Sequence, residues 1–131
     1  MEQKKVLIVD DEIHIVHVVA IKLRNNGYEV ISANNGSEAL ELACELKPDI
    51  IVTDFQMPVM TGMELVEKLR ENEQTKDIPV IMLTARSFAI SKEVQEKLNI
   101  SDCLSKPFSP RELLINIEDI LYQKETIAET K

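Results

Sequence analysis

Residues 50–62 read IIVTDFQMPVMTG, and this stretch decides the fold. Its first three residues are apolar, as in a strand that is buried on both faces of a parallel sheet. The strand ends on a carboxylate, Asp54, and the loop that follows contains Pro58 and Gly62, which are typical of turns. The stretch therefore predicts a core strand that carries an acid to the edge of a sheet.

Short apolar runs alternate with segments of helical periodicity along the chain. Besides the run at 49–53, they lie at residues 6–9, 28–33, 79–83 and, more weakly, 101–104. Gly27 and Asn99 lie where helices should end, because both residue types accept a left-handed backbone. The pattern predicts a (βα)5 chain, a doubly wound α/β fold whose parallel sheet has two helices on one face and three on the other. Three pairs fit capping boxes at helix starts: Asn35 and Glu38, Thr61 and Glu64, and Ser109 and Glu112.

Length and composition indicate one ordinary globular domain. The chain has 131 residues, of which 44% are hydrophobic and 29% are charged. We expect the domain to span residues 1–122, and residues 123–131 to form a polar C-terminal tail that frays. No apolar stretch approaches the roughly 18 residues that a membrane span needs. The polar N-terminus does not resemble a secretory signal, so we expect a cytoplasmic protein without membrane contact.

The net charge and the positions of the cysteines argue against several kinds of binding site. The formal net charge of −8 argues against direct nucleic-acid binding, because contact with phosphates needs clustered lysine and arginine. Cys44 and Cys103 lie far apart and without CxxC spacing, so neither a zinc site nor a disulfide framework is expected. We interpret both as small buried residues, with redox sensing by Cys103 as the alternative.

Polar residues gather at the ends of the predicted strands. In open α/β sheets the functional site lies beyond the carboxyl ends of the strands. Each such residue alone is more often a turn or cap residue, but their coincidence at one edge predicts a site. The first strand is followed by Asp10 and Asp11, the third ends on Asp54, the fourth on Thr84, and the fifth on Lys106 and Pro107.

The charges at this edge suggest its chemistry. Two carboxylates about 5 Å apart, at an effective dielectric of about 20, repel each other by roughly 3 kcal/mol. A divalent cation relieves this repulsion, and oxygen ligands favour Mg²⁺ over softer metals. Thr84 and Lys106 add a hydroxyl and an ammonium, so the edge suits a phosphoryl group. Asp54 can itself be the nucleophile that forms an aspartyl phosphate.

At these residues the sequence resembles the response-regulator receiver domains of two-component signalling. The motifs that carry the resemblance are VLIVDDE, DIIVTDFQMPVMTG, VIMLTA and LSKPF, and it runs from about residue 5 to residue 121. The resemblance implies a flavodoxin-like fold with strand order 2-1-3-4-5. It also implies that Asp54 accepts a phosphoryl group from a phosphohistidine.

The resemblance implies further roles at the same edge. Mg²⁺ would be bound by Asp11, Asp54 and the main-chain carbonyl of Gln56, while Asp10 would act through water. The phosphoryl group would be bound by Thr84 and Lys106. A cis peptide bond before Pro107 would turn Lys106 inward.

The sequence departs from the family pattern near this edge. Three residues before Lys106 the family often has an aromatic residue that moves inward with the threonine, and here Cys103 stands in that position. We therefore expect signalling through repacking of residues 84–91 and the following helix. Gln56 and Arg86 border the path of hydrolytic water in the family, and the bulky cation of Arg86 predicts an acyl phosphate that lasts for minutes or more.

The first helix carries unusual surface residues. His14 and His17 lie one turn apart; a metal site is one interpretation, and a solvated or partner-facing surface is the simpler one. Val16 and Ala20 make the helix more apolar than its core stripe requires, either as ordinary surface or as a docking site for the helical bundle of a phosphodonor. The expected core stripe has four members: Ile15, Val18, Val19 and Leu23.

We expect a phosphoacceptor receiver of a two-component system or phosphorelay, a switch rather than an enzyme, whose phosphorylation changes the protein contacts of its last two strands and helices. Its partners would be a sensor histidine kinase or a histidine phosphotransfer protein, and a downstream target or an effector domain outside this chain. The last helix lacks the basic residues of many DNA-binding regulators, which favours a standalone or relay receiver, monomeric or weakly dimeric when phosphorylated.

Three alternatives stay open at this point. An aspartate-based phosphohydrolase would need a second acid where Gln56 stands, so its turnover should be poor. A binding module that has lost phosphorylation would not need the full set of edge residues. An FMN-binding flavodoxin would need stacking aromatics, and the chain has no Trp and two Tyr.

Overall fold

The computed structural model describes residues 3–85 and 90–129, with side chains as far as Tyr122. Five strands form one parallel sheet in the order β2-β1-β3-β4-β5, which confirms the predicted fold. The strands are β1 (Lys5–Val9), β2 (Glu29–Ala33), β3 (Ile50–Asp54), β4 (Val80–Thr84) and β5 (Ile100–Ser105).

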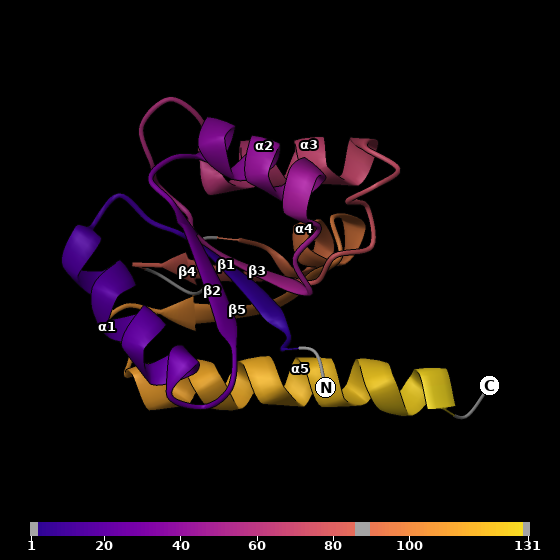
Figure 1. Ribbon diagram of the computed structural model, residues 1–131. Coiled ribbons are helices and arrows are strands. Elements are labelled where there is room, and N and C mark those ends of the chain that lie inside the picture. Colours follow the sequence, from indigo (N-terminus) through magenta and orange to yellow (C-terminus); the bar gives the residue numbers. More distant parts are fainter. Residues whose placement is uncertain (1–2, 86–89, 130–131) are drawn as a thin grey trace.

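Helices cover both faces of this sheet. Figure 1 shows α2, α3 and α4 on one side of the strands and α1 and α5 on the other, so the predicted division into three and two helices is confirmed. The helices are α1 (Ile13–Arg24), α2 (Gly36–Leu46), α3 (Gly62–Glu71), α4 (Lys92–Lys97) and α5 (Pro110–Glu129).

The core consists of two hydrophobic clusters, one on each face of the sheet. Alternate residues of a strand point to opposite faces, so Ile8 and Val52 pack toward α1 and α5. Their neighbours Leu7 and Ile51 pack toward α2 and α3. All four are essentially inaccessible to solvent. This two-sided burial explains why the strands read as continuous apolar runs.

Capping residues begin the helices where the sequence predicted. Thr61 and Glu64 form a complete capping box at α3. Asn35 and Ser109 accept hydrogen bonds from the backbone N–H groups three residues later. At α2 the box is not reciprocal, because the Glu38 side chain bonds the N–H of Asn34, one residue before the cap. The positive φ of Gly27 (91°) and Asn99 (55°) fits their predicted role at helix ends.

The predicted core stripe of α1 was partly wrong. Val18 is 52% exposed, whereas Ala20 is 5% exposed and Val16 packs against the core. Apolar residues surround most of this helix, so periodicity alone could not decide which side faces the sheet.

The last helix also differs from expectation. It continues to Glu129 and thus includes most of the segment that we expected to fray. Gln, Lys, Glu and Ala in this segment are good helix formers, which explains the extension. Among the residues that the structure describes, no helix is both long enough and apolar enough to cross a bilayer.

Candidate functional site

The polar residues singled out in the sequence meet at the carboxyl edge of the sheet. Asp10 follows β1, Asp54 ends β3, Thr84 ends β4 and Lys106 follows β5. Asp10 and Thr84 are buried, at 0% and 3% exposure. An open cleft at this edge is lined by Asp11, Glu12, Asp54, Phe55, Gln56, Thr84, Ala85 and Lys106.

Local backbone contacts hold Asp54 at the end of its strand. The N–H of Phe55 donates both to Asp54 Oδ1 (3.0 Å) and to the carbonyl of Leu83 (2.7 Å) on the neighbouring strand. The N–H of Gly62 donates to the carbonyl of Phe55 at 2.9 Å, which closes the loop. A Cβ atom on Gly62 would lie 2.3 Å from the carbonyl oxygen of Asp54. Only glycine allows α3 to begin this close to Asp54.

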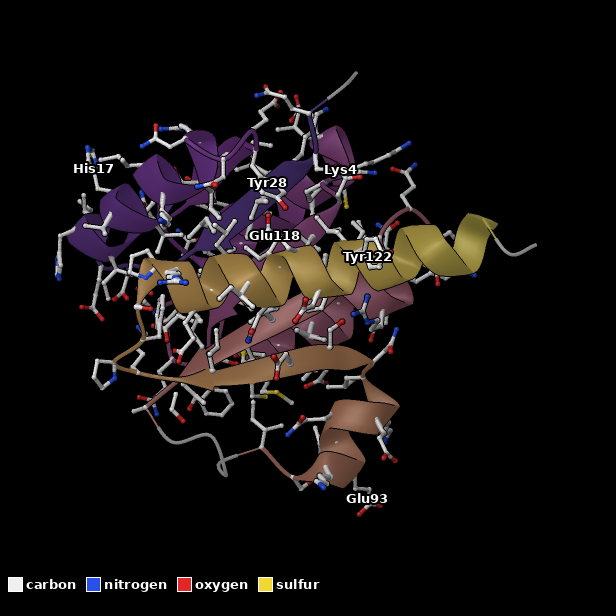
Figure 2. All side chains as sticks on the ribbon, turned by 90° about the horizontal axis from the view of Figure 1, so that it is seen from below. Lys4, His17, Tyr28, Glu93, Glu118 and Tyr122 are labelled. Carbon is white, nitrogen blue, oxygen red and sulfur yellow. The ribbon has the colours of Figure 1, made fainter. Side chains whose placement is uncertain are left out.

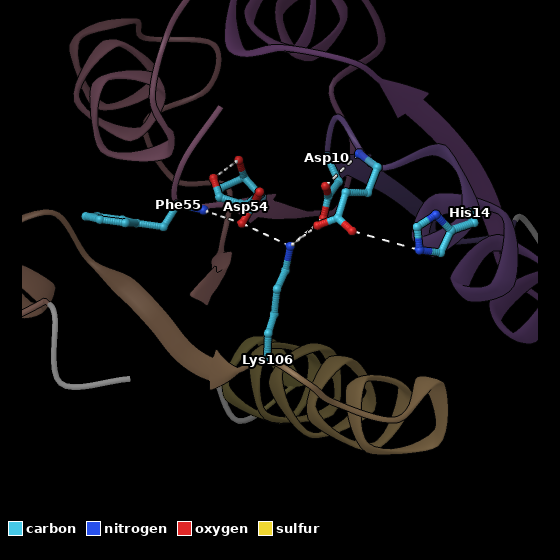
Figure 3. Close-up of polar contacts among 7 residues, drawn as sticks. Asp10, His14, Asp54, Phe55 and Lys106 are labelled. Carbon is cyan, nitrogen blue, oxygen red and sulfur yellow. Dashed lines mark hydrogen bonds and ion pairs between the residues drawn. The ribbon is translucent and has the colours of Figure 1, made fainter. Parts of the chain in front are cut away.

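Lys106 reaches into the site from the loop that follows β5. The peptide bond before Pro107 is cis, as the resemblance implied. The Lys106 N–H donates to the carbonyl of Thr84 at 2.8 Å. Lys106 Nζ lies 3.1 Å from Asp10 Oδ2 and 3.2 Å from Asp54 Oδ1, and Figure 3 shows it between these two carboxylates.

The charges at the site shift each other's pKa. Burial raises the pKa of Asp54 above its ordinary value and the charge of Asp10 adds to this, while Lys106 and the Phe55 N–H oppose it without cancelling it. For Lys106, burial alone would lower the pKa, but the hydrogen bond and charge of Asp10, together with Asp54, raise it. Lys106 therefore stays protonated and balances part of the negative charge.

Three carboxylates lie close enough to share one cation. One oxygen from each of Asp10, Asp11 and Asp54 lies within 4.8 Å of the other two. A single ammonium, that of Lys106, offsets the charge of Asp10 and Asp54. An oxygen-only set beside an open cleft fits Mg²⁺, which keeps some of its water ligands. The donor set therefore fits the metal that the sequence predicted.

The remaining predicted residues have different environments. Gln56 is exposed and lines the cleft, whereas Cys103 in β5 is half-buried rather than fully buried. Burial, and then the charge of Asp102, raise the pKa of the Cys103 thiol, which disfavours the reactive thiolate. His14 and His17 are exposed, in line with the surface interpretation.

Arg86 lies outside the described residues, as does the rest of 86–89, which is half of the segment 84–91 to which we assigned the conformational response. The role of Arg86 and the proposed repacking of residues 84–91 stay predictions.

Two groups at the site were missed in the sequence. Glu12 Oε1 lies 3.3 Å from Lys106 Nζ, so Glu12 is a third carboxylate partner of that lysine. The Phe55 N–H binds Asp54 directly. Glu12 directly follows the acidic pair in VLIVDDE, which was the available signal, whereas nothing in a residue type indicates a backbone donor.

Comparisons with known proteins agree with this geometry. Residues 6–118 match the family model described as the response regulator receiver domain. The chain is 40% identical over 121 residues to the phosphate regulon transcriptional regulatory protein PhoB of Pseudomonas aeruginosa, covering 92% of this chain and 53% of that protein. The chain spans about half the length of the curated relatives that it matches.

Solved structures give the same result. The chemotaxis protein CheY4 of Vibrio cholerae is 39% identical, with a TM-score of 0.83 over 90% of this chain and 98% of that one. The receiver domain of the sensor histidine kinase PA1611 of P. aeruginosa is 28% identical, with a TM-score of 0.80 over 90% of this chain and 97% of that one. That structure has a magnesium ion coordinated in its active site cleft.

Proposed function

The chain belongs to the response-regulator receiver family, and from this we propose that it is a phosphoacceptor switch in which Asp54 takes a phosphoryl group from a phosphohistidine. Receiver domains of this family work in two-component systems. One observation carries the assignment to Asp54: its carboxylate lies beside both the Lys106 ammonium, at 3.2 Å, and the acid pair Asp10 and Asp11. No other carboxylate among the described residues combines these neighbours with a place in the cleft.

The transfer step is a displacement at phosphorus. An oxygen of the Asp54 carboxylate attacks, a P–O bond forms, and the P–N bond to the donor imidazole breaks with its electron pair passing to nitrogen. Asp54 Oδ1 already binds Phe55 and Lys106, and none of the described residues donates to Oδ2. Oδ2 is therefore the oxygen that we assign to the attack.

The neighbouring residues neutralise the charge that the phosphoryl group brings. Lys106 is held for this role by Asp10, and Thr84 lines the same cleft. Asp11, Asp54 and the carbonyl of Gln56 would hold Mg²⁺ directly, and Asp10 would act through water. Bound there, the ion supplies positive charge for the equatorial oxygens during transfer.

A switch fits these residues better than an enzyme that turns over. An aspartate-based phosphohydrolase needs a second acid two residues after its nucleophile, and Gln56 cannot exchange a proton there. We therefore propose that the phosphorylated form persists and acts through altered contacts of the β4-α4-β5-α5 region with a downstream protein or effector domain.

The proposed phosphodonor docks on α1 and on the loop that precedes α5. Figure 2 shows α1 and α5 side by side, with His17 pointing outward from α1. Ile13 and Ile21 on α1 are 71% and 53% exposed, and Val18 joins Phe108 in an apolar groove. No residue of α1 is acidic, although the chain carries a net charge of −8. Such a face suits the helical bundle of a histidine kinase or phosphotransfer protein.

A charge on this face should separate docking from chemistry. Val18→Glu is expected to slow transfer from a phosphorylated kinase at least about tenfold, the cost of burying an unpaired charge at an interface. The rate with acetyl phosphate should stay the same. Ile115→Glu, at an exposed position on α5, is the matched control. If both variants slowed transfer equally, or if neither slowed it, the donor would not dock on this face of α1.

Intact-protein mass after incubation with acetyl phosphate and Mg²⁺ tests the proposed function. We expect a gain of one phosphoryl group in the wild type, and none without Mg²⁺ or in Asp54→Ala. Steady release of phosphate without an adduct would favour the hydrolase. The absence of both adduct and turnover would favour a binding module that has lost phosphorylation.

A further inference from the structure

Lys106 has three carboxylate partners in this structure, and two of them, Asp10 and Glu12, accept hydrogen bonds from its ammonium. Its Nζ lies 3.1 Å from Asp10, 3.2 Å from Asp54 and 3.3 Å from Glu12. An ammonium has three donors and no acceptor, so with three carboxylates around it Lys106 has little capacity left for another anion. A fourth anion at Lys106 therefore competes with these three carboxylates.

The three carboxylates are not equally free to leave. Asp10 has no solvent exposure, and its other oxygen accepts the backbone N–H of Glu12 at 3.0 Å. Asp54 is 8% exposed and is bound by the Phe55 N–H. The Glu12 side chain is 46% exposed. Among the described residues its one other partner is His14, whose Nε2 lies 3.9 Å from Glu12 Oε2. Moving Glu12 into water therefore costs least.

A phosphoryl group on Asp54 would bring oxygens to the same ammonium. We propose that Glu12 accepts a hydrogen bond from the Lys106 N–H group that would otherwise bind a phosphoryl oxygen. Through this competition Glu12 sets how readily an anionic phosphodonor enters the site. This inference rests on the proposed function. It makes Glu12 a positioning residue that acts through Lys106, and a residue that discriminates between phosphodonors by their charge.

Two substitutions separate this contact from simple charge repulsion. Glu12→Gln removes the carboxylate, and Glu12→Asp keeps the charge but is one methylene too short to hold Lys106. If the contact competes with the donor, both variants should be phosphorylated faster than the wild type. If long-range repulsion alone matters, Glu12→Asp should behave like the wild type. Glu41→Gln, at an exposed position on α2, removes the same charge away from the site and is the matched control.

The experiment measures phosphorylation of the full chain with Mg²⁺ by intact mass, using two small donors. We expect Glu12→Gln and Glu12→Asp to lower the concentration of acetyl phosphate, a dianion, that gives half-maximal rate by about two- to fivefold, the range that an exposed ion pair represents. The change should be smaller with phosphoramidate, which is a monoanion near neutral pH. Beryllofluoride titrations followed by NMR should show the same shift in half-saturation.

Several results would overturn the inference. Unchanged or slower phosphorylation of both variants would mean that Glu12 does not compete for Lys106. A gain in Glu12→Gln alone would reduce its effect to long-range charge. A gain of the same size in Glu41→Gln would remove any specific role. If the wild type accepted no phosphoryl group from either donor, the proposed function itself would fail, so the two failures are distinguishable.

Discussion

Asp54 lies beside a second buried carboxylate, Asp10, and burial together with that neighbour raises its pKa. The folded chain therefore keeps a proton on Asp54 at pH values where the unfolded chain has lost it. Protonation of Asp54 in the folded chain stabilises the fold below the ordinary carboxyl pKa. This contribution to the free energy of unfolding is lost as the pH rises from that value through the raised pKa of Asp54. At neutral pH the ionised Asp54 is thus a net cost to the fold in the absence of a cation.

Removing this charge should stabilise the protein. Asp54→Asn is expected to raise the free energy of unfolding at neutral pH, without Mg²⁺, by on the order of 1 kcal/mol, because it removes a charge that is costly to bury and that Asp10 repels. The gain should shrink as the pH falls, because the wild-type carboxyl then gains its proton. Urea unfolding across this range measures both effects, with the exposed Asp119→Asn as the control. If Asp54→Asn were less stable than the wild type at neutral pH, the ionised Asp54 would not be a net cost to the fold.

Val59 adopts a backbone conformation that β-branched residues rarely occupy. Its φ is +71°, its side chain is 83% exposed, and the N–H of Met60 donates to the carbonyl of Pro58 at 2.7 Å around it, as in a γ-turn. The side chain gains little by burial, so the strain is not offset by packing.

Glycine should relieve this strain. Val59→Gly is expected to stabilise the fold by about 1 kcal/mol, because glycine adopts positive φ without a Cβ clash. The midpoint of urea unfolding measures this gain. Val59→Ala is the control, since it keeps a Cβ at the same φ and should recover less. A loss of stability on Val59→Gly would show that the loop is not strained at this residue.

At the scale of elements, Arg70 joins two segments that lie far apart in sequence. From α3, its guanidinium donates to the carbonyls of Ile78 (2.8 Å) and Lys76 (2.8 Å) before β4, and to those of Leu98 (2.7 Å) and Asn99 (3.1 Å) between α4 and β5. None of the described carboxylates forms an ion pair with Arg70. Helix α4 has no fully buried residue and packs on the core through the partly buried Val94, so these bonds add a polar anchor at its C-terminal end.

Loss of this anchor should loosen α4. Arg70→Lys keeps the charge but cannot make these bonds together, so we expect destabilisation by about 2–3 kcal/mol. Hydrogen exchange at residues 92–100 should rise more than exchange elsewhere in the chain. Arg111→Lys, at an exposed position on α5, is the control. Uniform acceleration of exchange would mean that Arg70 supports the whole fold rather than this element.

The sequence predicted where the strands and helices lie better than it predicted which side of a helix faces the core. Strands buried on both sides are apolar without interruption, so runs such as 50–52 mark them directly. Helix starts were visible in capping residues such as Thr61. The inward face of α1 was not visible, because Val16 and Val18 are equally apolar and only packing against the sheet and α5 distinguishes them. The lysine contact of Glu12 depends on side-chain placement, which residue type does not fix.

At the scale of the whole molecule, the sheet explains why the site could be predicted at all. Parallel strands carry their carboxyl ends to one edge, so residues as distant in sequence as Asp10 and Lys106 had to meet there once the strand order was known. The strand order itself came from the resemblance rather than from periodicity. Among the described residues, the resulting site combines four carboxylates, those of Asp10, Asp11, Glu12 and Asp54, with the ammonium of Lys106. The proposed function depends on which of these carboxylates carries the phosphoryl group.

Borohydride trapping identifies the phosphorylated residue most directly. Borohydride reduces an acyl phosphate to an alcohol, which converts a phosphorylated aspartate to homoserine. After treatment with acetyl phosphate and Mg²⁺, peptide sequencing by mass spectrometry should find homoserine at position 54 and nowhere else. Homoserine at Asp10 or Asp11, or its absence from a protein that carries the phosphoryl mass, would contradict the assignment of Asp54 as the phosphoacceptor.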